Sequence, residues 1–352
     1  MSIGSGVDWA RRHARPITYV VGSFVISTWT LLRFFNQRTI FDLVSQQVIV
    51  HQWLHGAMSS AHLGLTHYVP KMLLLYVPLD LLPGSPRLKL ILLTLFVNIV
   101  TFVLLGLVLE KILRHFDLHV GLSFYGALLW LAAISGSVFW IEFTNSRNLE
   151  VVGGIYLLYL GLRFLQRSSW RLGLGLGVLS GLLFYADTLQ LYMIGLPLVV
   201  FGFVLIIKQK EVFRTYLQLL VWLGVGLLIS RLLFALSGHF LHLSFTETGS
   251  GSTASLSISP LVHGAVLSVK SFVTLFAGAA DAGKLREVAN LSVLVTGVGV
   301  FVYSVVKKCL PLQFVLLLAT IFITDELVYV ASGQALQAGS SRYLIMLAPT
   351  LV

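Results

Sequence analysis

Residues 88–109 read LKLILLTLFVNIVTFVLLGLVL and decide the fold of this chain. Lys89 is the only charged side chain in this run. An α-helix rises about 1.5 Å per residue, and the hydrocarbon core of a bilayer is about 30 Å thick. A helix formed by residues 88–109 is therefore long enough to cross a membrane.

Composition extends this interpretation to the rest of the chain. The sequence is 57% hydrophobic and 11% charged, with a mean hydropathy of +0.90, whereas soluble domains carry about 25% charged residues. We therefore expect an all-α protein, a polytopic bundle of transmembrane helices. Basic residues at cytoplasmic membrane boundaries account for much of the formal net charge of +10, so we expect no nucleic-acid partner. Cys309 is the only cysteine, which excludes an intramolecular disulfide.

Similar apolar runs predict about ten spans in a single transmembrane domain covering residues 1–352. The predicted spans are residues 17–35, 88–109, 122–143, 151–165, 172–186, 189–207, 215–237, 291–306 and 311–332, and a last one that begins at Tyr343. The last run is cut by the end of the sequence, so we expect the natural protein to continue beyond Val352. Alternating glycines at 173–177 lie inside an apolar span, which favours close helix packing over a phosphate-binding loop.

Basic residues predict the orientation of the spans, because the short loops that carry them are cytoplasmic as a rule. They gather at alternate span ends, at Arg11, Arg12, Arg15, Lys111, Arg114, Arg163, Arg167, Arg171, Lys208, Lys210, Arg214, Lys307 and Lys308. This pattern places the tail 1–16 in the cytoplasm and the long segments 36–87 and 239–290 outside it. We expect a multi-pass protein of the cell's inner membrane whose functional face is the non-cytoplasmic one.

Segment 36–87 concentrates polar groups, among them Asp42, His67, Tyr68 and Lys71. Polar groups held at a membrane face are typical of chemistry or of recognition. Prolines interrupt the later part of the segment, so we expect residues 68–82 to form a broken, half-embedded element.

The spacing of residues 40–55 is typical of an amphipathic helix lying on the membrane. Its apolar positions are Phe41, Val44, Val48 and Trp53, and its polar positions are Gln47, His51 and His55. His51 and His55 are four residues apart and share a helix face. A zinc site would need further ligands, for which His62 and His67 are the candidates, and no H-E-x-x-H signature is present. We therefore assign no metal site from the sequence.

Further polar residues fall at the predicted outer ends of spans. They are Arg147 and Glu150 in the link 144–150, Asp187 in the turn before the sixth span, Asp325 and Glu326 late in the ninth span, and Arg342 before the last. The charged residues in short turns could simply be solvated by water. An arginine, however, also presents a bidentate fork of N–H donors that suits a phosphate. Adjacent acids inside an apolar helix are costly and usually face a cavity or a partner.

Short motifs near the outer span ends suggest a family. They are Phe41-Asp42-Leu43 after the first span, Ser146-Arg147-Asn148-Leu149-Glu150 at the fourth, Asp187 after the fifth and Ser341-Arg342-Tyr343-Leu344 before the last. With the topology of nearly the whole chain, this arrangement resembles the GT-C-type membrane glycosyltransferases, which include protein mannosyltransferases and aminoarabinose transferases. Better-known members often have adjacent acids in the first outward loop, whereas Asp42 stands alone here, with Asp80 as a second candidate.

The resemblance implies a hexosyl- or pentosyltransferase that moves a sugar from a polyprenyl-phosphate donor to a glycan, lipid or protein acceptor outside the cytoplasm. It maps the general base onto Asp42. An anionic leaving phosphate calls for cations, and those available are Arg147, Arg342 and Lys71, while Tyr68 has a ring suited to stacking on a sugar. The other residues expected at the substrate and phosphate are His67, Glu150, Asp187, Asp325 and Glu326. A divalent metal bound through Asp or Glu is compatible with this chemistry, but no cofactor is required by it.

Two other classes of function remain open at this point. A transporter or lipid flippase would also have many spans, and it predicts polar groups near the bilayer midplane and two related halves. The sequence has no evident internal repeat, and most of its candidate charges fall near one face, which favours the enzyme. A non-catalytic scaffold would leave the costly Asp325–Glu326 pair without a role.

Overall fold

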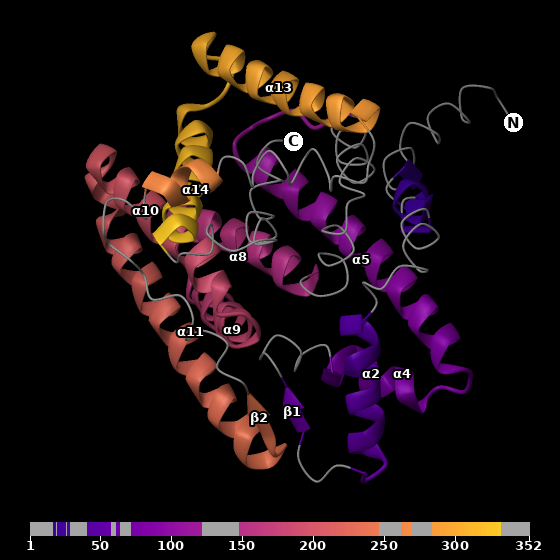
Figure 1. Cartoon of the computed structure of the whole chain (residues 1–352). Helices are drawn as coiled ribbons and strands as arrows, with labels where there is room; N and C mark the ends of the chain where they lie inside the picture. Colours follow the sequence, from indigo (N-terminus) through magenta and orange to yellow (C-terminus); the bar gives the residue numbers. More distant parts are fainter. Residues whose placement is uncertain are drawn as a thin grey trace, which may run out of the picture.

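Figure 1 shows the computed structural model, which describes residues 17–28 apart from 19 and 26, 41–57, 61–63, 72–121, 148–245, 262–268 and 284–331. Its α-helices are α2 (Phe41–Leu54), α4 (Val77–Leu81), α5 (Pro86–His115), α8 (Asn148–Gln166), α9 (Trp170–Ala186), α10 (Leu196–Lys208), α11 (Phe213–Phe240), α13 (Lys284–Val306) and α14 (Leu312–Ala331). Shorter elements are the π-helical η2 (Met72–Tyr76) and η3 (Leu191–Gly195), the 3-10 helix η4 (Lys210–Val212), and the strands β1 (Ala61–Leu63) and β2 (Leu243–Phe245). The described part is therefore helical, as predicted, apart from two short strands.

Four helical stretches of the described residues are long and apolar enough to cross a membrane. They are Pro86–His115, Leu191–Lys208, Lys210–Phe240 and Leu312–Ala331, which coincide with the predicted spans 88–109, 189–207, 215–237 and 311–332. Trp170–Ala186 and Val295–Val306 are shorter apolar helices at two further predicted spans. The predicted spans 122–143 and that beginning at Tyr343 lie outside the described residues.

Local sequence explains where two of these helices begin. Ser85 precedes α5, and its Oγ accepts a hydrogen bond from the backbone N–H of Leu88 at 3.3 Å. Pro86 follows at the first helical position. A backbone N–H at this position would have no acceptor within the helix, so the absence of one in proline costs nothing. Ser169 caps α9 in the same way, accepting from the N–H of Leu172 at 3.3 Å. Such caps satisfy backbone donors that a helix start leaves without an acceptor.

α9 and α11 pack closely because α9 presents glycines to its neighbour. A Cβ placed on Gly173 would lie 2.1 Å from Nε1 of Trp222, and one on Gly181 would lie 2.6 Å from Cγ2 of Ile229. Small residues let helix backbones approach each other, and van der Waals packing of this kind joins helices where lipid replaces water. The predicted role of the glycines in helix packing is confirmed at Gly173 and Gly177, while Gly175 faces open space.

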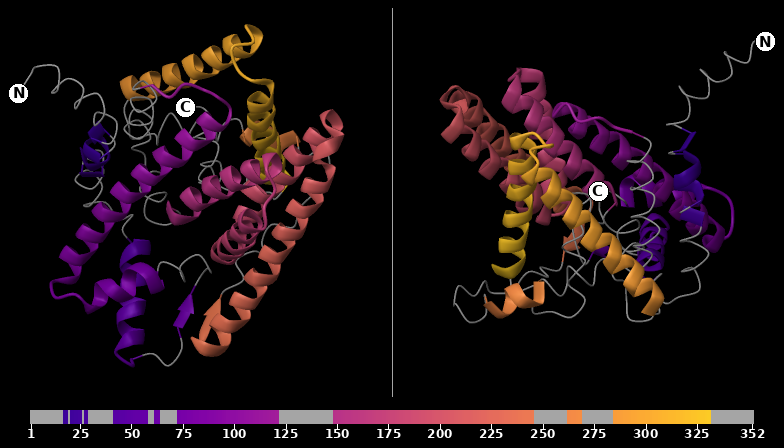
Figure 2. Two further views of the ribbon diagram at one scale, coloured as in Figure 1. Left: turned by 180° about the vertical axis from the view of Figure 1, so that it is seen from behind. Right: turned by 90° about the horizontal axis from the view of Figure 1, so that it is seen from above.

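The core of the bundle draws one or more fully buried side chains from each of α8, α9, α10, α11 and α14. The largest in each helix are Phe164, Leu176, Phe201, Leu219 and Leu317, none more than 2% exposed. Figure 2 shows α11 along the outer side of this bundle. α13 lies across one end of it in both figures, rather than alongside α14.

A second, smaller apolar cluster covers the opposite end of the bundle from α13. It joins Val50 of α2, Tyr76 of η2, Leu90 of α5 and Tyr185 of α9, and α2 and η2 also pack against α4. We call α2, η2 and α4 the cap, and the end of the bundle that they cover the capped end (Figure 1). α9 and α11 finish there and α5 begins there.

The strands tie two distant segments together at the capped end. β1 pairs with β2 in parallel, with Ala61 opposite Leu243 and Leu63 opposite Phe245. β1 belongs to the segment 36–87, and β2 follows α11 in the segment 239–290. Residues 61–63 and 243–245, one short part of each long segment expected on the outer face, therefore lie side by side.

Candidate functional site

The helix expected over residues 40–55 is present as α2, at Phe41–Leu54. Asp42 lies in its first turn, and the side chain of Asp42 is outside the described residues. α2 carries His51 in its last turn, and His55 follows immediately after the helix. The candidate base and the histidine pair therefore belong to one element of the cap.

The buried side of α2 differs from the predicted one. Gln47, expected on the polar side, is 8% exposed, and Val48, expected on the apolar side, is 47% exposed. The reason is that α2 packs on protein through Val50, which is fully buried against Tyr76 and its neighbours. Contacts of α2 with η2, α5 and α9, rather than the apolar stripe of the sequence alone, set which of its residues are buried.

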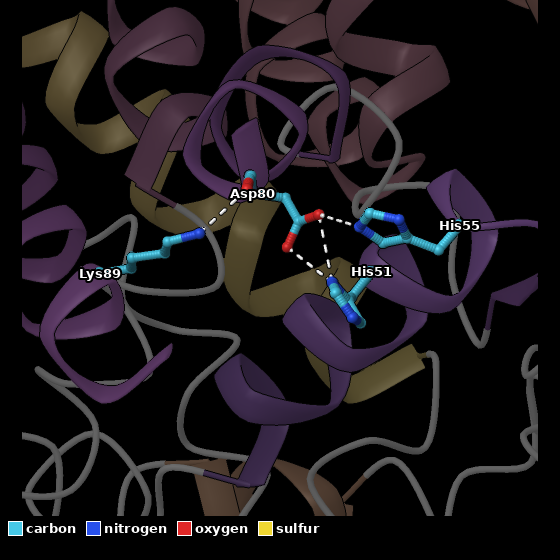
Figure 3. Close-up of polar contacts among 4 residues, drawn as sticks. All are labelled: His51, His55, Asp80 and Lys89. Atoms are coloured by element: carbon cyan, nitrogen blue, oxygen red, sulfur yellow. Dashed lines mark hydrogen bonds and ion pairs between the residues drawn. The ribbon is translucent and has the colours of Figure 1, made fainter. Parts of the chain in front are cut away.

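His51, His55 and Asp80 converge between α2 and α4 (Figure 3). Nδ1 of His51 lies 3.0 Å from Oδ1 and 3.2 Å from Oδ2 of Asp80, so the protonated nitrogen donates to the carboxylate. Nε2 of His55 lies 3.4 Å from Oδ2 of the same carboxylate. The two imidazole rings are 4.3 Å apart between centroids. The predicted shared face of His51 and His55 is thus confirmed, and the side chain that joins them is Asp80.

The backbone around this cluster fixes its geometry. The N–H of His55 donates to the carbonyl of His51 at 3.1 Å, which continues the helical pattern to the second histidine. Gly56 then ends the helix with φ +71°. Its N–H donates to the carbonyl of Trp53, and the N–H of Ala57 donates to the carbonyl of Gln52. This pair of hydrogen bonds is a Schellman motif, which favours glycine at the left-handed position.

Asp80 is held from its other side by Lys89. Nζ of Lys89, in the first turns of α5, donates to the backbone carbonyl of Asp80 at 2.9 Å (Figure 3). The Asp80 side chain is 8% exposed, whereas those of His51 and His55 are 59% and 62% exposed. The carboxylate is therefore enclosed, and the imidazoles form the open side of the cluster.

A second group of predicted residues lies on elements that pack against η3. Glu150 opens α8, Asp187 follows the end of α9 and Asp325 lies in α14, and all three are buried. η3 packs against α8, α9, α10 and α14. Three carboxylates are thus drawn into the bundle from helices that meet at one short element.

The buried acids have different local roles. Oδ1 of Asp187 accepts from the N–H of Leu189 at 3.0 Å, which stabilises the turn between α9 and η3. Within the described residues, neither carboxylate oxygen of Asp325 has a hydrogen-bond partner. Glu326, beside it, accepts a hydrogen bond from Oγ of Ser268, which anchors the helical residues 262–268 to α14. Placing two adjacent acids inside an apolar helix is costly, and at Glu326 the hydrogen bond from Ser268 offsets part of this cost.

Five predicted site residues lie outside the described part of the chain. They are His67, Tyr68, Lys71, Arg147 and Arg342. His62, a candidate third ligand for the histidines, lies in β1, and its side chain is outside the described residues.

The contact between Asp80 and the histidines is not predictable from the sequence, which offers Asp80 only as a second candidate for the base. His51 and Asp80 are 29 positions apart, and no local periodicity relates residues on two different helices. The histidine spacing was the one signal available, because it predicts a shared face but not what meets that face.

No protein-family model, no curated protein and no solved structure matches this chain. Its chemistry is therefore inferred from its own residues and their arrangement.

Proposed function

We propose that the chain is a membrane glycosyltransferase of the GT-C type, working at the capped end of its helix bundle. It transfers a sugar from a polyprenyl-phosphate donor to a glycan, lipid or protein acceptor on the non-cytoplasmic face. The capped end is the outer end in this proposal, and about ten spans embed the whole chain in the membrane.

The observation that carries the proposal is the junction between the cap and the bundle. Val50 of α2 packs in one cluster with Tyr185, which lies two positions before Asp187. Asp42 lies on the same helix as Val50, about 12 Å away along the axis at 1.5 Å per residue. The helix bearing the candidate base and the turn bearing a second candidate acid are therefore neighbours, although more than a hundred residues separate them.

The strand pairing also supports the proposal that the capped end is the outer, functional end of the molecule. β1 and β2 join the two long segments at the capped end, whereas Lys111, Lys208 and Lys307 lie at or near the far ends of α5, α10 and α13. Basic residues gather on the cytoplasmic side of membrane proteins, and this supports the proposal that the capped end is the outer one.

The proposed reaction uses groups of these types. The acceptor hydroxyl attacks the anomeric carbon, a bond forms between them, and the bond from that carbon to the phosphate oxygen breaks. Asp42 takes the hydroxyl proton as general base. Attack opposite the leaving group inverts the anomeric centre. The polyprenyl phosphate leaves as an anion, and Arg147, Arg342 and Lys71 are the cations proposed to stabilise it.

The direct test replaces Asp42 with Asn in the purified full chain and follows sugar release from a labelled polyprenyl-phosphate donor. General base catalysis contributes about 10²- to 10⁴-fold, so we expect Asp42→Asn to slow transfer by at least about 100-fold. Asp117→Asn is the matched control, because Asp117 is exposed in the turn after α5 and its φ of 58° is one that Asn tolerates.

Undiminished transfer by Asp42→Asn would remove Asp42 as the base. If Asp80→Asn abolished transfer instead, the base would be Asp80. A transporter or flippase, the rival function, would move the labelled donor across a sealed bilayer with its sugar–phosphate bond intact.

A further inference from the structure

The three side chains that converge between α2 and α4 are of the types that bind transition metals. An imidazole nitrogen from each histidine and a carboxylate oxygen from Asp80 all lie within 4.8 Å of one another. Among the described residues, this is the one group of three or more His, Cys, Asp or Glu side chains close enough to share an ion. The group draws on two separate helices, so the fold of the cap assembles it.

The spacing of these atoms suits a small tetrahedral ion. Zinc binds imidazole nitrogen and carboxylate oxygen at about 2.0–2.1 Å, which places neighbouring ligand atoms about 3.3 Å apart in a tetrahedron. Nδ1 of His51 and Nε2 of His55 lie 3.2 Å and 3.4 Å from the same oxygen of Asp80, Oδ2, and the three ligand atoms all lie within 4.8 Å of one another. Small side-chain rotations would therefore be enough to admit an ion among the three groups.

We propose that His51, His55 and Asp80 bind a divalent transition-metal ion of the zinc class, leaving a fourth coordination position open. Two imidazoles and one carboxylate are ligands suited to zinc, whereas calcium and magnesium favour oxygen ligands. Three protein ligands with one position left over are typical of metal sites that bind water or a further ligand.

The surroundings allow such an ion to enter. Both histidine side chains are more than half exposed, so an ion can reach the imidazoles from solvent. Lys89 bonds the backbone carbonyl of Asp80 rather than its carboxylate, and it lies on the far side of Asp80 from the histidines (Figure 3). The carboxylate charge therefore remains directed toward the imidazoles. The metal-site proposal does not rest on the proposed sugar transfer, because metal binding is measured directly.

The test measures metal binding by the full chain, purified in detergent without a polyhistidine tag and stripped with a chelator. Zn²⁺ is titrated in competition with a chromophoric chelator, and Co²⁺ is titrated while its visible absorption is recorded. We expect one ion per chain with the strong absorption of four-coordinate Co²⁺. His51→Ala and Asp80→Asn should each weaken Zn²⁺ binding by at least about 100-fold, beyond the roughly 10- to 100-fold typical of losing an outer partner.

His119→Ala is the matched control, because His119 is exposed in the described structure and lies outside the cap. It should bind Zn²⁺ as the unaltered chain does, and so should Asp42→Asn, whatever its effect on sugar transfer. His51→Gln, checked by circular dichroism and gel filtration, separates loss of a ligand from loss of the fold.

The proposal is overturned if the unaltered chain binds no more Zn²⁺ than the triple variant of His51, His55 and Asp80. It is equally overturned if His51→Ala retains full affinity, or if Mg²⁺ or Ca²⁺ binds more tightly than Zn²⁺. In those cases the three side chains form only a hydrogen-bonded contact between α2 and α4.

Discussion

The glycine-packed pair of α9 and α11 and the cap of α2, η2 and α4 are held together in different ways. α9 and α11 meet along their length, with glycine backbone against Trp222 and Ile229. The cap meets the bundle through a small cluster around Val50 and Tyr76, and through polar contacts of Asp80. The first is a continuous packed surface, and the second is a short helix assembly held at a few points.

This difference bears on where function can reside. A continuously packed pair of helices has little room to rearrange, because each close contact leaves no space for movement. The cap presents exposed imidazoles and polar atoms that can exchange with solvent, while the acids near η3 are enclosed by helices. We therefore expect the bundle to serve as a scaffold, and the cap with the adjoining turn at Asp187 to carry the groups that meet ligands.

The largest effect is expected inside the bundle, from Gly181→Ala. The added Cβ would lie 2.6 Å from Cγ2 and 2.7 Å from Cβ of Ile229, and 3.1 Å from the carbonyl oxygen of Gly226. Overpacking costs about 1–3 kcal/mol, which outweighs the gain in helix propensity of up to about 1 kcal/mol. Gly175→Ala lies on the same helix, where no atom of the described part of the chain is within 4 Å of the added Cβ, and it should keep the propensity gain.

We therefore expect the free energies of unfolding of these two variants to differ by about 2 kcal/mol, with Gly181→Ala the less stable. Unfolding in mixed micelles, followed by circular dichroism, measures the difference. Equal stabilities would show that α9 and α11 are not in the close contact described.

A smaller effect is expected in the cap, from Gly56→Ala. No atom of the described residues lies within 4 Å of the added Cβ, so the expected cost comes from φ +71°, about 1 kcal/mol. The strain falls next to His55 and should weaken Zn²⁺ binding as well. The stability of Gly56→Asn should lie between that of the unaltered chain and that of Gly56→Ala, because Asn tolerates the left-handed region. An alanine variant with unchanged stability and Zn²⁺ affinity would contradict the Schellman geometry after α2.

Features that depend on neighbouring residues were predictable from the sequence. Apolar runs located the long helices, the glycines at 173–177 indicated close packing, and the spacing of His51 and His55 gave their shared face. Each follows from composition or helix periodicity within one element.

Features that depend on contacts between distant elements were not predictable. The pairing of β1 with β2 joins residues far apart in the chain, and three-residue strands carry almost no periodic signal. The meeting of Asp80 with the histidines depends on how α4 sits against α2. The burial of Gln47 and the exposure of Val48 were predicted wrongly, because Val50 packs against Tyr76, Leu90 and Tyr185 and these contacts decide which side is buried.

In the proposed function, the capped end lies outside the cytoplasm. The chain supplies an internal reference, because its single cysteine, Cys309, is exposed between α13 and α14, beside Lys307 and Lys308 at the other end of the bundle. Gln52, exposed on α2, can be replaced by cysteine in a Cys309→Ser background to report on the cap.

The decisive measurement applies a membrane-impermeant thiol reagent to sealed right-side-out vesicles. One sample contains the unaltered chain, whose only cysteine is Cys309, and the other contains the Gln52→Cys variant in the Cys309→Ser background. Labelling of Gln52→Cys before permeabilisation, with Cys309 labelled only afterwards, is the predicted result. Labelling of Cys309 first, with Gln52→Cys protected until the membrane is opened, would place the cap in the cytoplasm and contradict the account.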